Sequence, residues 1–343
     1  MTLLLTGGTG FIGSHTLVEL LFSGYKNIVI IDNLSNSKDS VLKNVYEITK
    51  EITDKKIDFY NVDILNYMDL KKIFAYYKEL NKPINTIIHF AALKSVSESL
   101  KKPDLYYKTN IVGTINLLDM MKKYNCNNLI FSSSATVYGN QKYPVSENSI
   151  TGNGITNPYG RTKYMIEEIL RDYSLANPHF NIVLLRYFNP VGAHPSGLIG
   201  EDPNGIPNNL CPYIIKVAMG KIDKLMINGS DYDTDDGTCK RDFIHVVDLA
   251  KAHVAAVKKI NELKNINIYN VGTGNGISVL EFVLEFQEVN KISINYDFGP
   301  RREGDLPVVY AEVNKIKEEL GWKAEKSLKD ICIDSYNFAK QIS

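Results

Sequence analysis

The fold of this chain is decided by the stretch Thr6-Gly7-Gly8-Thr9-Gly10-Phe11-Ile12-Gly13. It follows a short apolar run and opens an amphipathic one. The glycines permit a tight turn, bring the backbone close to a pyrophosphate and let a helix pack closely on a strand, while the helix N-terminus offers free N–H groups to an anion. Because its spacing is Gly-x-x-Gly-x-x-Gly rather than Gly-x-Gly-x-x-Gly, the stretch alone also fits an ordinary strand–helix turn.

Asp32 strengthens the prediction of a dinucleotide site. It ends the second apolar run, 19 residues after Gly13, where an acid should meet the adenosine ribose. A carboxylate there accepts hydrogen bonds from the 2′- and 3′-hydroxyls and repels a 2′-phosphate, so we predict NAD rather than NADP. Asp63 ends the third run, a position suited to the adenine amino group or to a helix N-cap.

Short apolar runs alternate with longer amphipathic segments over the first half of the chain. This order predicts an α/β fold with a doubly wound parallel sheet, Rossmann-like. The expected strands are 2–6, 27–31, 57–61, 86–90, 128–132 and 181–187, and the expected helices are 12–21, 40–49, 68–77, 105–124 and 159–177.

After residue 187 the pattern changes. The segments 188–209 and 225–238 read as long loops, 266–271 as a strand that returns to the sheet, and 278–343 as helices with short strands. We therefore predict two domains. Residues 1–188 plus 240–276 should bind NAD, and residues 189–239 plus 277–343 should form a smaller mixed α/β domain for the substrate.

Composition narrows the class of partner. Among 343 residues, 39 Lys and Arg balance 39 Asp and Glu, which removes the attraction that nucleic acids or anionic membranes need. Four scattered cysteines suggest neither a disulfide framework nor a metal site. Without a signal peptide or an uncharged run of about 18 apolar residues, we expect a soluble cytoplasmic protein that binds small molecules.

Tyr159 and Lys163 stand four residues apart at the start of a predicted helix, so they share one face. A tyrosine that acts as a base near pH 7 needs its pKa lowered by about three units, worth ~4 kcal/mol. An ammonium about 5 Å away supplies ~3 kcal/mol, and the positive ring of oxidised NAD can supply the rest. Ser134 follows the fifth strand, at the carboxyl edge where ligands bind, and can pass a proton between substrate and Tyr159.

With these residues in place, the sequence resembles the extended short-chain dehydrogenase/reductase family and, within it, the UDP-galactose (UDP-glucose) 4-epimerases. The similarity covers essentially the whole chain. It is carried by the blocks 6–16, 88–91, 131–139, 157–160, 185–192, 205–210, 241–249 and 301–305.

The resemblance implies a role for each matching residue. Tyr159 would be the acid/base, with Lys163 and Ser134 as its partners. The implied NAD contacts are Gly7, Gly10, Phe11, Ile12, Gly13, Asp32, Asn33, Asp63, Ile64, Phe90, Ala91, Lys94, Asn110, Tyr159, Lys163, Tyr187 and Phe188. The implied nucleotide-sugar contacts are Ser134, Asn189, Asn209, Leu210, Arg241, Arg302, Asp305 and Val309. Arg241 and Arg302 have the planar donors that suit a diphosphate, although Arg301-Arg302-Glu303 also fits a salt-bridged surface run.

Three positions depart from the family pattern. Phe243 replaces a frequent Tyr, so a contact through that hydroxyl is lost, and Asn228 stands where relatives tend to carry an aromatic residue near the uracil. Val309 occupies a position that is a bulky Tyr in some relatives and small in others. The resemblance links its size to whether a 2-acetamido sugar fits.

The activity implied is reversible C4 epimerisation of UDP-galactose and UDP-glucose through a 4-keto intermediate, with transient hydride transfer to tightly bound NAD. We expect UDP-N-acetylhexosamines to be accepted as well. Three alternatives stay open: an epimerase mainly for UDP-N-acetylglucosamine and UDP-N-acetylgalactosamine, a nucleotide-sugar 4,6-dehydratase, and a non-catalytic NAD-binding sensor. The dehydratases resemble this chain except for an Asp-Glu pair, replaced here by Ala135 and Thr136. The resemblance also implies a homodimer through helices 105–124 and 159–177, although their apolar stripes fit packing on their own sheet equally well.

Overall fold

The computed structural model describes residues 1–202, 209–302 and 304–342. Its centre is a parallel sheet of seven strands in the order β11-β6-β5-β4-β1-β2-β3. The strands are β1 (Thr2–Thr6), β2 (Asn27–Asp32), β3 (Lys56–Asn61), β4 (Ile84–His89), β5 (Asn128–Ser134), β6 (Asn181–Tyr187) and β11 (Ile266–Val271). The chain reverses its winding between β1 and β4, where a doubly wound sheet forms its ligand crevice. The predicted fold class is confirmed.

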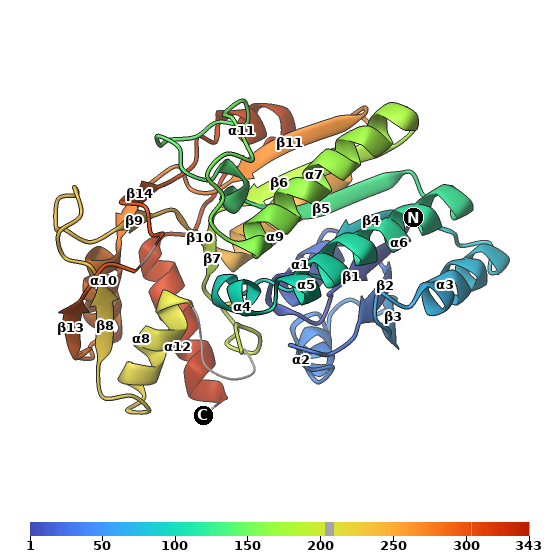
Figure 1. Cartoon of the computed structure of the whole chain (residues 1–343). Helices are drawn as coiled ribbons and strands as arrows, with labels where there is room; N and C mark the ends of the chain where they lie inside the picture. Colours follow the sequence, from blue (N-terminus) through green and yellow to red (C-terminus); the bar gives the residue numbers. More distant parts are fainter. Residues whose placement is uncertain (203–208, 303, 343) are drawn as a thin grey trace.

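Helices cover both faces of this sheet (Figure 1). One face carries α1 (Phe11–Phe22), α2 (Val41–Ile48), α9 (Val246–Lys259) and α11 (Asn314–Leu320), and the other carries α3 (Tyr67–Glu79), α6 (Gly113–Tyr124) and α7 (Pro158–Ala176). Inner strands such as β1 and β2 are buried on both sides, which explains their nearly continuous apolar sequences. Helices α9 and α4 (Val96–Lys101) are additional to the predicted set.

The single helix predicted over 105–124 is wrong in detail. The structure has α5 (Pro103–Tyr106), a π-helical segment η1 (Tyr107–Val112) and then α6. At the junction, a Cβ on Gly113 would lie 2.4 Å from Cδ1 of Ile64, so the chain approaches its neighbour more closely than another residue allows. Such local widening of a helix is not visible in apolar periodicity.

A second lobe lies beyond the carboxyl edge of the sheet (Figure 1). Its helices are α8 (Leu210–Ala218), α10 (Val279–Asn290) and α12 (Leu328–Gln341). Its short sheets join β7 (Asn189–Val191) to β10 (Phe243–His245), β9 (Lys240–Arg241) to both β12 (Ile277–Ser278) and β14 (Val308–Val309), and β8 (Leu225–Asn228) to β13 (Tyr296–Gly299). The predicted loop 225–238 therefore begins with a strand. The division into two domains stays a prediction.

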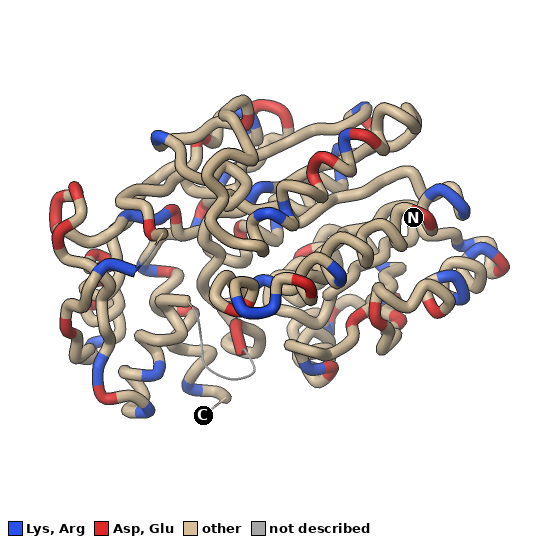
Figure 2. Tube along the Cα trace, in the orientation of Figure 1, with Lys and Arg blue, Asp and Glu red and all other residues tan. Residues whose placement is uncertain are grey.

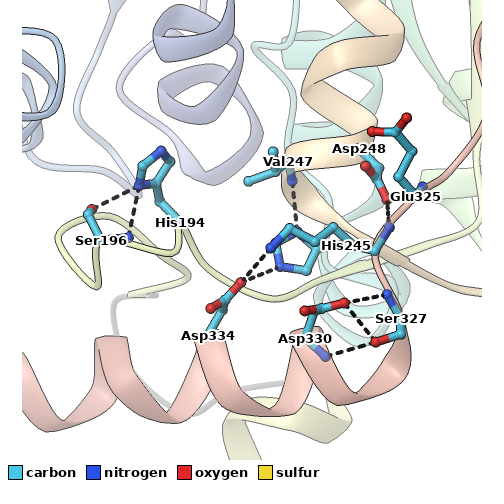
Figure 3. Close-up of polar contacts among 10 residues, drawn as sticks. His194, Ser196, His245, Val247, Asp248, Glu325, Ser327, Asp330 and Asp334 are labelled. Atoms are coloured by element: carbon cyan, nitrogen blue, oxygen red, sulfur yellow. Dashed lines mark hydrogen bonds and ion pairs between the residues drawn. The ribbon is translucent and has the colours of Figure 1, made fainter.

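Helix α12 is tied to the start of α9 by polar contacts (Figure 3). Nδ1 of His245 accepts a hydrogen bond from the Val247 N–H at 3.1 Å, so its Nε2 is the nitrogen that meets Asp334, also at 3.1 Å. The carboxylate of Asp248 accepts the N–H of Glu325 at 2.9 Å. These contacts hold α12 and the segment before it against the start of α9, which packs on one face of the sheet.

Both signs of charge are spread along the helices of the whole chain, as its balanced composition predicts (Figure 2). Within the described residues, no helix combines the length and apolar character needed to cross a membrane. The four cysteines are free and buried.

Candidate active site

A cleft of about 2550 Å³ runs along the carboxyl edge of the sheet and on between the two lobes. Single small-molecule sites usually measure about 300–1,000 Å³, so this cleft has room for two ligands. The residues predicted from sequence that line it are Gly7, Gly10, Phe11, Ile12, Gly13, Asp32, Asn33, Asp63, Ile64, Phe90, Ala91, Lys94, Ser134, Tyr159, Lys163, Tyr187, Phe188, Asn189, Asn209, Leu210, Arg241, Arg302, Asp305 and Val309.

Asn110 is the exception, and its place beside the nicotinamide stays a prediction. Its side chain is fully buried and does not line the cleft. The amide nitrogen donates to the carbonyl of Leu93 at 3.1 Å and to Oγ1 of Thr162 at 3.0 Å, while its oxygen accepts the Leu93 N–H at 2.8 Å. Asn110 therefore ties η1 to α7 and to the loop after β4.

The glycine-rich turn is packed so tightly that side chains are excluded. A Cβ on Gly13 would lie 2.3 Å from the carbonyl oxygen of Gly7, and a Cβ on Gly7, whose φ is +70°, would lie 2.8 Å from the Ala91 nitrogen. Gly10 precedes α1 and no side chain caps the helix. The first N–H groups of α1 therefore face the cleft, and this cradle fits the pyrophosphate of a dinucleotide.

Asp32 lies beside this turn, with 8% of its surface exposed. Its carboxylate accepts hydrogen bonds from the Thr9 N–H at 3.2 Å, the Leu34 N–H at 2.9 Å and the Ser37 hydroxyl at 2.9 Å. Because a carboxylate has about four acceptor positions, Asp32 keeps capacity for one ribose hydroxyl.

Asp63 accepts the Asn33 side-chain amide at 2.8 Å and the Leu65 N–H at 2.8 Å. It is not the N-cap of α3, because Asn66 fills that position and accepts from the Asp69 N–H. Of the two interpretations that the sequence left open for Asp63, the helix cap is therefore excluded.

The predicted reactive residues meet where β5 ends and α7 begins. Asn157 caps α7 by accepting the Gly160 N–H at 2.8 Å, so Tyr159 stands in the first turn, and its hydroxyl bonds with Ser134 at the end of β5. One turn later, the Lys163 ammonium donates to the carbonyl of Ser132 at 2.5 Å and lies 4.7 Å from the centre of the Phe131 ring.

Burial controls the proton affinities of this pair. Burial raises the pKa of Tyr159, whereas the hydrogen bond with Ser134 acts to lower it. Burial also lowers the pKa of Lys163 to about 7, and the nearby Glu167 carboxylate opposes that change. The protein alone therefore keeps Tyr159 protonated. This agrees with the expectation that Tyr159 becomes a base only beside a positively charged cofactor.

The far end of the cleft carries the two predicted arginines. Asp305 accepts from Arg302 at 2.8 and 3.1 Å, and its Oδ1 lies 3.5 Å from Nη2 of Arg241. Arg241 also donates to the carbonyl of Leu306 at 2.8 Å. Arg301 points elsewhere and pairs with Asp231 at 2.7 Å. The surface-run interpretation thus holds for Arg301, whereas Arg302 lines the cleft; Glu303 lies outside the described residues.

Asn209 and Leu210 stand at the N-terminus of α8, whose first N–H groups lack a side-chain cap. Val309 lies in β14 beside Arg241 of β9 and packs against the cluster that contains Ala135 and Phe188. It therefore stands between the arginine end and the reactive end of the cleft, where its own size would limit the size of a sugar substituent.

The two other departures also line the cleft. Phe243 is buried, with its ring 4.9 Å from that of Phe282, edge to face. Asn228 ends β8 and is exposed. Neither position supplies the contact that the family pattern predicts.

Sequence reasoning missed the ion pairs that join the two sides of the cleft. Glu201 lies 3.2 Å from Lys94 and accepts from the Asn209 amide at 2.9 Å, while Asp202 pairs with Lys38 at 2.6 Å. Lys94 and Glu201 are 107 positions apart in the chain. No local pattern signals such a pair.

Comparison with known proteins agrees with this site. The family model described as GDP-mannose 4,6 dehydratase matches residues 4–335. A UDP-glucose 4-epimerase of Haemophilus influenzae is 52% identical over 341 residues, which is 99% of this chain and 98% of that protein. The solved UDP-glucose 4-epimerase of Bifidobacterium longum, in complex with NAD+ and UDP, has a TM-score of 0.92 at 47% identity and covers 99% and 98% of the two chains. The UDP-Glc/GlcNAc 4-epimerase of Campylobacter jejuni has a TM-score of 0.84 at 38% identity and covers 99% of each chain. The chain therefore belongs to the family that the GDP-mannose 4,6 dehydratase model describes and, within it, to the UDP-glucose 4-epimerases.

Proposed function

We propose that this chain interconverts UDP-galactose and UDP-glucose by inverting C4, with NAD as its cofactor. The observation that carries the proposal is the junction of β5 and α7, where Ser134, Tyr159 and Lys163 meet inside a cleft that has room for two ligands. The sequence predicted this activity, and membership of the UDP-glucose 4-epimerase family supports it.

In this proposal, the glycine-rich turn and Asp32 would hold NAD, which would supply the acceptor and donor for the hydride at C4 of the sugar. Tyr159 accepts the proton of the O4 hydroxyl, with Ser134 as the group that passes it, and gives it back when the 4-keto sugar is reduced. Lys163 stabilises the tyrosinate by its charge. The new configuration requires the keto sugar to turn and present its other face.

A sugar that turns cannot be held firmly, so the binding energy belongs on the UDP half. Arg241, Arg302 and the N-terminus of α8 provide donors there. Because Asp305 already accepts from Arg302, a bound diphosphate would replace that ion pair, and the carboxylate would then be free to accept from the ribose hydroxyls.

The alternatives are weaker. A 4,6-dehydratase needs an extra acid and base to remove water, and Ala135 and Thr136 provide neither. A silent NAD-binding sensor would not need Tyr159 and Lys163, which both remain. We include UDP-N-acetylhexosamines as additional substrates because Val309 is small and one relative is a UDP-Glc/GlcNAc epimerase.

The direct test mixes the purified protein with UDP-galactose, without added NAD, and follows UDP-glucose by NMR. We expect conversion to an equilibrium mixture, with no net redox change. UDP-N-acetylgalactosamine runs in parallel. Release of a dehydrated sugar, or no conversion even when NAD is supplied, would refute the proposed activity.

We further propose that the protein is a homodimer through the segment α5–η1–α6 and helix α7, which cover the predicted helices 105–124 and 159–177. The inner faces of α6 and α7 pack on their own sheet through side chains such as Leu118 and Leu170, as the alternative interpretation of their apolar stripes expects. Met165 of α7 (42%) and Ile115 of α6 (36%) nevertheless remain exposed. A second copy of the chain would cover these side chains.

Replacing both Met165 and Ile115 by Glu is expected to produce monomers, because two facing pairs of carboxylates would be buried together. Light scattering should show twice the chain mass for the natural protein and one chain mass for the variant. Phe22→Glu, which changes an exposed apolar residue on α1, is the control and should stay dimeric. A natural protein that runs as a monomer would contradict the proposal.

A further inference from the structure

Beneath the reactive residues lies a buried ion pair that the proposed reaction does not touch. Glu167 is 0% exposed and Arg186 is 1% exposed. The guanidinium donates from Nε to Oε1 at 3.0 Å and from Nη2 to Oε2 at 2.6 Å. The Ser133 hydroxyl also donates to Oε1, at 2.5 Å.

The position of Glu167 relates it to the reactive residues. Tyr159, Lys163 and Glu167 follow one another at intervals of four on α7, so they form one row along the helix. On β5, Ser133 stands between Ser132, whose carbonyl accepts from Lys163, and Ser134, which bonds with Tyr159. Glu167 is thus connected to the reactive residues Tyr159, Lys163 and Ser134 through both α7 and β5.

Stability alone does not explain this pair. Two charges removed from water lose about as much hydration energy as their attraction returns, and apolar residues of similar size often serve equally well. Lys163, however, is a buried ammonium whose charge the reaction needs. Burial lowers its pKa to about 7, and Glu167 is the carboxylate that opposes this change.

The other polar groups around Lys163 and Glu167 are neutral or already paired. His89 on β4 is kept neutral by burial, which lowers its pKa to about 3. Tyr138 accepts from Arg186 at 3.0 Å, and Arg171 lies 3.6 Å from Glu167 at the outer end of the row. On the side of α4 and α5, Tyr106 donates to Glu98 at 3.1 Å. Tyr187 of β6 bonds with His253.

We propose that Glu167 is a positioning residue that keeps Lys163 in its charged form and fixes the end of β5 beneath Ser134. Arg186 holds the carboxylate in place from the neighbouring strand. The proposal rests on the proposed function, because it concerns the charge that stabilises the Tyr159 oxyanion.

The test compares the pH profiles of kcat for the NAD-loaded natural protein and Glu167→Gln. Activity is lost as the pH rises through the pKa of Lys163, because the ammonium gives up its proton. Without the Glu167 carboxylate the pKa of Lys163 falls. The alkaline limb of the kcat profile, where activity declines with rising pH, should therefore move to lower pH by about one unit, with about tenfold lower turnover on that limb. Glu168→Gln is the matched control: its carboxylate is on the outside of the same helix, 3.1 Å from Arg171, and the limb should not move.

Two further variants separate charge from packing. Glu167→Asp keeps the charge and should hold the limb near its natural position even where stability is reduced. Glu167→Gln/Arg186→Gln removes both charges and so avoids an unpaired guanidinium. Because a neighbouring guanidinium also lowers the pKa of Lys163, the downward shift should be smaller than in Glu167→Gln, and its sign tests the proposal if the single variant does not fold. An unmoved limb in a folded variant without the Glu167 carboxylate would overturn the proposal, as would equal shifts in the Gln and Asp variants. Inactivity of the natural protein would instead refute the epimerase function.

Discussion

Tyr159→Phe is expected to lower the turnover of UDP-galactose by about 10³–10⁴-fold, near the upper end of what one acid/base group contributes. The substitution removes the hydroxyl that bonds with Ser134 and leaves the ring in the first turn of α7. Without it, the O4 proton has no acceptor at the position where the hydride leaves. Initial rates of UDP-glucose formation measure the loss.

The bound NAD of the variant should be quantified by absorbance, so that loss of cofactor is not mistaken for loss of the base. Tyr173→Phe is the control, because it makes the same change on the same helix at a residue that does not line the cleft. Turnover equal to that of the natural protein in Tyr159→Phe would remove Tyr159 from the mechanism.

Val309→Tyr is expected to lower the conversion of UDP-N-acetylgalactosamine by about 100-fold and to change that of UDP-galactose by only a few fold, because a steric clash discriminates between substrates. Val309 is held by main-chain pairing with β9, and its carbonyl accepts the Asp242 N–H at 3.0 Å. A tyrosine there would project into the cleft between the diphosphate site and the reactive residues. The ratio of the two kcat/KM values measures the effect.

Val308→Tyr provides a matched comparison, because successive side chains of a strand point to opposite sides and Val308 does not line the cleft. It should leave the ratio of the two activities unchanged. Equal loss of both activities in Val309→Tyr would show that this position affects the site as a whole and does not select the sugar.

The parts of the site that depend on nearby residues could be predicted from the sequence. The glycine-rich turn and Asp32 follow from spacing along one βαβ unit, and the strands could be located because a sheet buried on both faces needs apolar runs. The interval between Tyr159 and Lys163 places them on one helix face for the same local reason. The π-helical segment at 107–112 could not be predicted, because a local change from α- to π-helical hydrogen bonding leaves no clear mark in the apolar periodicity.

By itself, the sequence determined the doubly wound sheet and the glycine-rich turn that fits a dinucleotide, and it predicted which residues exchange a proton. The tertiary structure alone decided their environment: Asn110 faces the protein, Asp305 pairs with Arg302, and the Glu167–Arg186 pair lies under Lys163. The physical reason is that proton affinity depends on burial and on charges within a few ångströms. Those neighbours come from distant strands and helices, so only the folded chain brings them together.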